Sequence, residues 1–174
     1  MEKVIFLDID GVLTPTMYNN ALYKMWKNNN ECKSRDDFGD YFSPWAVDYL
    51  YKIINDTSAK IVISSTWRMS GLKHMREMWE YRRLPGDVIS ITPECTEVIK
   101  NGNDMIYYDS VCRGHEINMW MEMRNFTGNY VIIDDTPDML LDQEPFFVKT
   151  NDRIGLTLAD ANKCIEILNK KNNG

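Results

Sequence analysis

The sequence predicts an α/β fold built around a mainly parallel sheet. Three short apolar runs are rich in Val and Ile and show no polar alternation, which is typical of parallel strands covered on both faces. These runs are Lys3–Ile9, Lys60–Ser64 and Asn129–Ile133. Stretches with helical periodicity fall between them, and strands that alternate with helices indicate a parallel sheet.

The first strand is followed by residues 14–42, which fit this alternation poorly. They carry an aromatic and apolar stretch and then a polar one. They are also too long for an ordinary connection between a strand and a helix. We therefore expect a small insertion with one or two helices, close to whatever the first strand presents at its end.

Four helices and two weaker strands are expected after this insertion. Ser43-Pro44 is a favourable helix start, since Ser can cap a helix and Pro suits its first position. Ser70 can cap a second helix, a third begins near Arg113, and a fourth runs from Thr157 to Lys170 with its apolar face inward. The weaker strands are Asp87–Ile91 and Phe146–Lys149. The apolar residues at helical spacing are Ala46, Val47, Leu50, Tyr51, Ile54, Leu72, Met75, Met78, Trp79, Ile117, Trp120, Met121, Leu158, Ala161, Ile165 and Leu168.

Length, charge and cysteine usage limit the class of protein. The 174 residues are 44% hydrophobic, so we expect residues 1–174 to form one domain with a sizeable core. A net charge of −6 argues against a protein that binds along nucleic acid without sequence preference, but not against an enzyme that handles one nucleotide or strand end. Four separated cysteines without a CxxC pair favour reduced thiols in a cytoplasmic protein over a zinc site. The apolar run Val4–Leu7 is too short for a signal peptide or a membrane span, so no membrane partner is expected.

Polar residues follow three of the predicted strands at the point where each strand ends. Asp8 and Asp10 follow the first, the segment 64–68 (Ser-Ser-Thr-Trp-Arg) follows the second, and Asp134-Asp135 follow the third. Ligands of open parallel sheets bind beyond the carboxyl ends of the strands, so these residues should gather on one rim. Singly, each could be a turn, a helix cap or an ordinary strand end. Together, four carboxylates would repel one another unless a cation lay between them, and an all-oxygen ligand set favours Mg²⁺.

This combination of motifs resembles the haloacid dehalogenase-like (HAD) phosphatase superfamily. The matching segments are Val4–Leu13 for the first motif, Ile61–Ser64 for the second and Val131–Asp135 for the last. The resemblance runs from Val4 to about Ala161 and is weakest over Thr14–Phe42 and Pro93–Cys112. It implies a three-layer Rossmann-like HAD fold, in which residues 14–42 form a small cap-like insertion.

Two further segments are similar to the small HAD domains of bacterial and phage RNA-repair proteins. In those domains a strand end like Ser64–Arg68 and a helix start like Arg113–Ile117 recur. The small size of the insertion indicates an open site, which suits a nucleotide or the phosphorylated end of DNA or RNA as substrate. The sequence indicates no obligate protein partner.

Two carboxylates one residue apart at a strand end can divide nucleophilic and acid–base work. The resemblance implies that Asp8 attacks phosphorus and forms an aspartyl-phosphate, while Asp10 protonates the leaving oxygen and then activates water. It also implies a Mg²⁺ ion held by the Asp8 side chain, the Asp10 carbonyl and an acidic residue after the last strand. That residue is Asp135, with Asp134 as the alternative. Gly11 should let the backbone turn sharply beside the phosphate.

The phosphate itself needs donors and a positive charge. Ser64 is expected to donate to a phosphate oxygen, with Ser65 as the alternative. The family also uses a cation upstream of the last strand; Arg113, near a helix start, is our choice and Lys100 its rival. Arg68 is expected to be a second phosphate or substrate contact, the other interpretation being a solvated residue at a helix start.

The leading hypothesis is a Mg²⁺-dependent phosphomonoester hydrolase that acts on a nucleotide or a phosphorylated nucleic-acid end. A sugar phosphate or a phosphoprotein stays open as substrate. Asp10 favours a phosphatase, because dehalogenases and phosphonate-cleaving relatives lack an acid at that position. The alternatives are a non-catalytic nucleotide- or protein-binding module on the same scaffold, and a phosphotransferase that passes the phosphoryl group to an alcohol.

Overall fold

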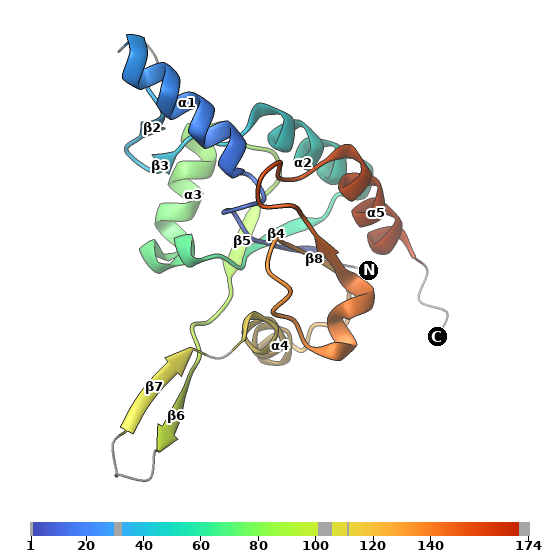
Figure 1. Ribbon diagram of the computed structural model, residues 1–174. Helices are drawn as coiled ribbons and strands as arrows, with labels where there is room; N and C mark the ends of the chain where they lie inside the picture. Colours follow the sequence, from blue (N-terminus) through green and yellow to red (C-terminus); the bar gives the residue numbers. More distant parts are fainter. Residues whose placement is uncertain (1, 30–32, 101–105, 111, 171–174) are drawn as a thin grey trace.

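The computed structural model describes residues 2–29, 33–100, 106–110 and 112–170. At its centre lies a five-stranded sheet in which every pairing is parallel (Figure 1). Both the α/β class and the five strands expected from the sequence are confirmed. In sheet order the strands are β5 (Val88–Ile91), β4 (Lys60–Ile63), β1 (Lys3–Leu7), β8 (Asn129–Asp134) and β9 (Phe147–Lys149).

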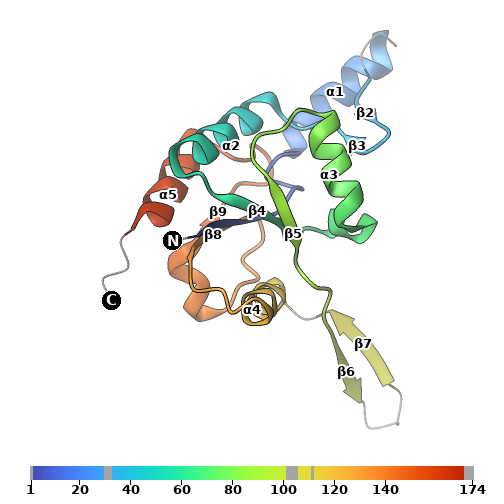
Figure 2. The same ribbon diagram turned by 180° about the vertical axis from the view of Figure 1, so that it is seen from behind.

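Helices cover both faces of this sheet and so form the outer layers (Figures 1 and 2). The alternation of side chains along β1 divides the core between the two faces. Ile5 and Leu7 belong to the larger of two hydrophobic clusters, on one face of the sheet. Val4 and Phe6 belong to the smaller cluster on the other face, together with Ile117 and Trp120. One face carries α2 (Pro44–Thr57), α3 (Gly71–Tyr81) and α5 (Leu158–Asn169), and the other carries α4 (Arg113–Met123).

The helix starts follow the predicted positions but differ in capping. Ser43 precedes Pro44 at the start of α2, as predicted, but its side chain makes no capping hydrogen bond. Thr157 caps α5 and exchanges hydrogen bonds with Asp160. Ser70 stands before α3 but makes no capping bond, because the 3₁₀ turn η1 (Thr66–Ser70) leads directly into the helix and gives Ser70 helical backbone angles. Leu158, expected to face inward, is 48% exposed because it is the first residue of α5 and lies at the edge of the apolar face of that helix. None of the helices in the described residues combines the length and apolarity needed to cross a membrane.

The insertion after β1 contains one helix and a short hairpin. The helix α1 (Thr16–Asn29) projects from the body of the molecule (Figure 1), and the antiparallel strands β2 (Arg35–Asp36) and β3 (Gly39–Asp40) follow it. Arg82, at the end of α3, anchors this hairpin through hydrogen bonds to the Asp36 carboxylate and the Gly39 carbonyl. The sequence predicted one or two helices in residues 14–42. The described part of this insertion has one helix, followed by a hairpin in its second half.

A second hairpin extends from the sheet between β5 and α4. It consists of the antiparallel strands β6 (Thr96–Lys100) and β7 (Ile106–Ser110), which both views show directed away from the body (Figures 1 and 2). The sequence analysis predicted no element here. A further 3₁₀ turn, η2 (Leu141–Phe146), leads into β9.

Candidate active site

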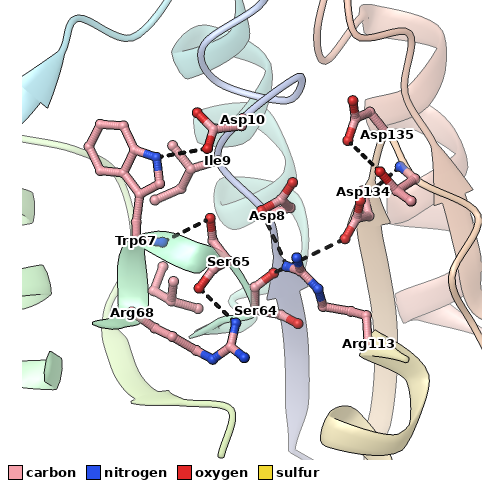
Figure 3. A network of polar contacts seen from close by, with 12 residues as sticks. Asp8, Ile9, Asp10, Ser64, Ser65, Trp67, Arg68, Arg113, Asp134 and Asp135 are labelled. Carbon is pink, nitrogen blue, oxygen red and sulfur yellow. Dashed lines mark hydrogen bonds and ion pairs between the residues drawn. The ribbon is translucent and has the colours of Figure 1, made fainter. Parts of the chain in front are cut away.

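The three polar strand ends meet at one rim of the sheet (Figure 3). Asp8 and Ser64 are the first residues after β1 and β4, and Asp134 is the last residue of β8. Their backbones continue the ladder of the sheet: the Asp8 N–H donates to Ile133 at 3.0 Å, and the Ser64 N–H donates to Leu7 at 2.8 Å. The register of the parallel strands therefore fixes these positions beside one another.

Three carboxylates gather at this rim and form what we call the aspartate cluster. One oxygen from each of Asp8, Asp134 and Asp135 lies within 4.8 Å of the other two. Asp8 and Asp134 are buried, and Asp135 is half-buried. An all-oxygen group of this kind has the chemistry of a hard-cation site. Both acidic residues that the sequence left as alternatives belong to it.

The aspartate cluster holds more negative charge than its surroundings offset. Burial raises the pKa of Asp8, although the charge of Arg113 opposes the shift. Burial and the neighbouring Asp8 carboxylate together raise the pKa of Asp134 to about 7, again against Arg113. A bound cation would relieve this repulsion, so the residues fit a divalent metal.

Arg113 is the cation that reaches the aspartate cluster. Its Nη1 atom lies 3.3 Å from Oδ1 of Asp8 and 3.6 Å from Oδ2 of Asp134, and it also donates to the Ser64 carbonyl. Arg113 opens α4, where Asp138 accepts a hydrogen bond from its backbone N–H at 3.0 Å. Lys100 ends β6, and its side chain lies outside the described part of the chain.

Asp10 follows the same strand as Asp8 but lies in a different environment. Its Oδ1 atom accepts a hydrogen bond from the Thr14 hydroxyl at 3.0 Å, and its Oδ2 atom accepts one from the Trp67 indole N–H at 3.0 Å. The side chain is exposed and stands apart from the aspartate cluster (Figure 3). The end of β1 thus presents one buried and one exposed carboxylate at the rim, Asp8 and Asp10, each with its own partners.

Gly11 lies at the turn directly after Asp10. Its φ of +68° falls in the left-handed region, which disfavours side chains. A Cβ atom at this position would also collide with the carboxylate of Asp135. The sharp turn expected at Gly11 is present, and the group that approaches it most closely is Asp135.

The two serines after β4 differ in their hydrogen bonding. The Ser64 hydroxyl is buried and has no partner among the described residues. The Ser65 hydroxyl accepts a hydrogen bond from the Trp67 backbone N–H at 3.4 Å. A hydrogen bond from the Ser65 side chain also opposes the rise in the pKa of Asp8, so Ser65 lies against that carboxylate, whereas the Ser64 hydroxyl is enclosed and has no partner in the described part of the chain.

Arg68 is not brought to the aspartate cluster. Its guanidinium turns the other way (Figure 3) and donates to the Ser65 carbonyl at 2.8 Å and to Glu116 of α4 at 2.6 Å. Both side chains of this ion pair are less than a tenth exposed. Arg68 is therefore neither a solvated residue nor a group that faces the rim.

Sequence reasoning missed two partners of the site, Glu116 and Trp67. Glu116 lies on α4 beside Ile117 and four residues before Trp120, so it shares the inward face of the predicted helix. A charged residue on such a face needs a buried partner, and this was an available signal. Trp67 lies in the segment 64–68 that was expected on the rim, but nothing in the sequence singles out its indole N–H as a partner of Asp10.

The comparison with protein families found one match. Residues 4–161 match the family described as "HAD domain in Swiss Army Knife RNA repair proteins". A search of the curated proteins found no match to this chain. The matched range includes the entire rim and both segments in which the sequence resembles such domains.

Proposed function

Because the chain belongs to the family of HAD domains in Swiss Army Knife RNA repair proteins, and so is a HAD-type hydrolase in general terms, we propose that it is a Mg²⁺-dependent phosphatase. It hydrolyses phosphomonoesters through a phosphoryl group carried on Asp8. One observation carries the proposal: Asp8 lies in the aspartate cluster, whereas Asp10 stands outside it between Thr14 and Trp67. This separation suits a nucleophile and an acid–base residue.

In the first half of the reaction, a carboxylate oxygen of Asp8 attacks the phosphorus atom. An oxygen–phosphorus bond forms to Asp8 while the bond to the leaving oxygen breaks, and Asp10 gives that oxygen a proton. In the second half, Asp10 takes a proton from the water that attacks phosphorus. The bond to Asp8 then breaks, and inorganic phosphate is released.

Residues around Asp8 bind and orient the phosphate. The Ser64 hydroxyl, which has no partner among the described residues, is assigned to a phosphate oxygen, with Ser65, which bonds Asp8, as the alternative donor. Arg113, already within reach of Asp8, supplies positive charge. Ser65 and Gly11 shape the backbone beside the phosphate. Arg68 acts outside this set of contacts.

The aspartate cluster and the backbone carbonyl of Asp10 would hold the Mg²⁺ ion. When bound, the ion offsets the repulsion between the attacking carboxylate and the phosphate oxygens. The raised pKa values of Asp8 and Asp134 support this assignment, because they reflect carboxylates whose charge is incompletely balanced.

The proposed substrate is a nucleotide or a phosphorylated nucleic-acid end. The description of the matched family, which names RNA repair, supports this choice. We place the protein in the cytoplasm, where the free thiols of Cys95, Cys112 and Cys164 would stay reduced. No membrane or obligate protein partner forms part of the proposal.

A screen of phosphate release tests the function. The substrates are nucleotides, sugar phosphates, and oligonucleotides with a 5′- or a 3′-phosphate, each with Mg²⁺ and with EDTA. We expect Mg²⁺-dependent release that is fastest from a nucleotide or an oligonucleotide end. Tight nucleotide binding without turnover would instead favour a non-catalytic module, and a phosphorylated acceptor alcohol among the products would indicate a phosphotransferase.

A further inference from the structure

A buried ion pair lies next to the site but outside the chemistry assigned so far. Nη2 of Arg68 lies 2.6 Å from Oε1 of Glu116, and the two side chains are 8% and 6% exposed. Arg68 belongs to η1, directly after the Ser64–Ser65 segment, and Glu116 belongs to the first turn of α4. The pair therefore joins the turn that follows one proposed phosphate contact, Ser64, to the helix that carries the other, Arg113.

The contacts around this pair form a closed ring. Arg68 donates to the Ser65 carbonyl at 2.8 Å and to Glu116, which lies three residues after Arg113 on α4. Arg113 in turn donates to the carbonyl of Ser64. Two consecutive carbonyls of one segment are thus each held by an arginine, and both arginines are linked through α4.

Stability alone gives little reason for this ion pair. Removing two charges from water is costly, and an apolar pair of similar volume often stabilises a protein as well or better. The Nε atom of Arg68 is also buried without a partner in the described part of the chain, so the hydrogen bonding of the guanidinium is incomplete. What charged groups supply and apolar groups do not is a directional link between the strand end and the helix.

We propose that Arg68 and Glu116 are positioning residues that fix the Ser64–Ser65 segment relative to Arg113. This inference rests on the proposed phosphatase function, in which Ser64 and Arg113 converge on one phosphate. The backbone N–H of Cys95 also donates to Glu116, at 3.4 Å, so the chain after β5 is tied to the same point. Neither Arg68 nor Glu116 touches the substrate.

A double variant separates positioning from simple stabilisation. Arg68→Met with Glu116→Leu removes both charges and leaves neither one buried alone, although the Ser65 carbonyl and the Cys95 N–H each lose a partner, so the unfolding midpoint should stay close to that of the wild type. Loss of such supporting contacts typically costs ~10–100-fold in affinity or activity. We expect that loss in kcat/KM for para-nitrophenyl phosphate, and a weaker affinity for inorganic phosphate measured with Mg²⁺ present.

Two further variants complete the experiment. Arg76→Met is the matched control: Arg76 donates to the carbonyls of Val88 and Ile89 on β5, at 2.7 and 3.0 Å, and lies outside the site. Its kcat/KM should stay within about twofold of the wild type, below the ~10–100-fold loss expected for positioning contacts. Arg68→Lys keeps the charge but brings one nitrogen to two acceptors, so an intermediate loss with an unchanged midpoint is expected.

The outcomes distinguish this inference from the proposed function. Full kcat/KM and full phosphate affinity in the double variant, or full kcat/KM in Arg68→Lys, would overturn the positioning role. So would a lowered midpoint in the double variant while the folded fraction keeps wild-type kinetics. If the wild type binds phosphate without turnover, the proposed function fails and the phosphate affinities alone decide the inference. A wild type that neither binds nor hydrolyses phosphate overturns both.

Discussion

Two regions in which carboxylates lie beside an arginine, the insertion and the rim, balance their charge differently. In the insertion, Asp36 receives two hydrogen bonds from Arg82, at 2.9 and 2.6 Å, and one from the Phe38 N–H. At the rim, the guanidinium of Arg113 lies beside two of the three carboxylates of the aspartate cluster. Its Nη1 atom is 3.3 Å from Asp8 and 3.6 Å from Asp134.

The pKa values of the two regions move in opposite directions. Burial alone would raise the pKa of Asp36, but the Arg82 hydrogen bonds outweigh it and lower the pKa below its usual value. At the rim burial prevails, and the pKa values of Asp8 and Asp134 are raised. In the insertion the Arg82 charge thus offsets that of Asp36, whereas the rim is a group of charges that needs a further cation.

The largest effect is expected from Asp8→Asn, which removes the proposed nucleophile. An amide cannot form the aspartyl-phosphate, so turnover should fall by about 10⁴-fold or more. The fold should survive, because the change removes a charge that burial disfavours. Phosphate release and the unfolding midpoint measure the two effects.

Asp36→Asn is the matched control for that variant. It breaks a buried ion pair and leaves the Arg82 charge uncompensated, which typically costs ~3–5 kcal/mol. We therefore expect a lower unfolding midpoint and near-normal turnover of the folded protein. If Asp36→Asn lost activity and Asp8→Asn only stability, the two regions would have been assigned the wrong way round.

Removing the metal should abolish phosphatase activity, since the rim would then lack the cation that its charges need. With EDTA, phosphatase activity should disappear, and it should return when Mg²⁺ is added, because the cluster offers oxygen ligands only. A zinc-selective chelator should leave the activity intact. Full turnover in metal-free buffer would contradict the cation site.

Asp10→Asn should have an effect that depends on the leaving group. General acid–base help typically contributes ~10²–10⁴-fold, and it matters most when the leaving alkoxide is a poor one. An alkyl phosphate should therefore lose far more activity than para-nitrophenyl phosphate, whose leaving group departs with little help. Rates for the two ester types measure this, and equal losses would argue against acid catalysis by Asp10.

The smallest effect concerns the pH dependence of stability without metal. The pKa of Asp134 is about 7 in the folded protein against an ordinary value of 3.8. Between these values the folded state holds a proton that the unfolded chain has lost, so the free energy of unfolding falls as pH rises from about 4 to 7. We expect a lower midpoint at pH 8 than at pH 5, and Asp134→Asn should flatten the difference.

Asp36 should contribute in the opposite direction. Because its folded pKa is lowered, its stabilisation is present at neutral pH and is lost as the pH falls below about 4. Asp36→Asn should therefore flatten the acid side of the stability curve. Unfolding midpoints measured from pH 2 to 8 with EDTA would test both carboxylates. The same pH profile for Asp134→Asn and Asp36→Asn would contradict the opposite pKa shifts of the two residues.

The sheet and its rim were predictable because parallel strands leave a strong signal. Covered strands are continuous apolar runs, and the residue after each run lies at the carboxyl end of the sheet. Asp8, Ser64 and Asp134 could therefore be placed on one rim from their positions alone. The hairpin of β6 and β7 gave no such signal, because its strands pair only with each other and lie outside the core.

The contacts that tie the rim together could not be predicted. Arg68 meets Glu116 across 48 positions of sequence, and Trp67 meets Asp10 across 57. Such pairings depend on how η1 and α4 pack on the sheet, which periodicity does not encode. Arg68 was accordingly expected to contact the substrate or solvent, although its length and position suit a bond to α4 equally well.

The central claim is that Asp8 carries the phosphoryl group, and trapping that intermediate tests it most directly. Asp10→Asn should slow the attack of water, so the phosphoenzyme should accumulate with para-nitrophenyl phosphate labelled with ³²P. After a rapid acid quench and proteolysis, we predict that the label lies on the peptide containing Asp8 and is absent when Asp8→Asn is combined with Asp10→Asn. Turnover without a labelled protein, or a label on another peptide, would contradict the account.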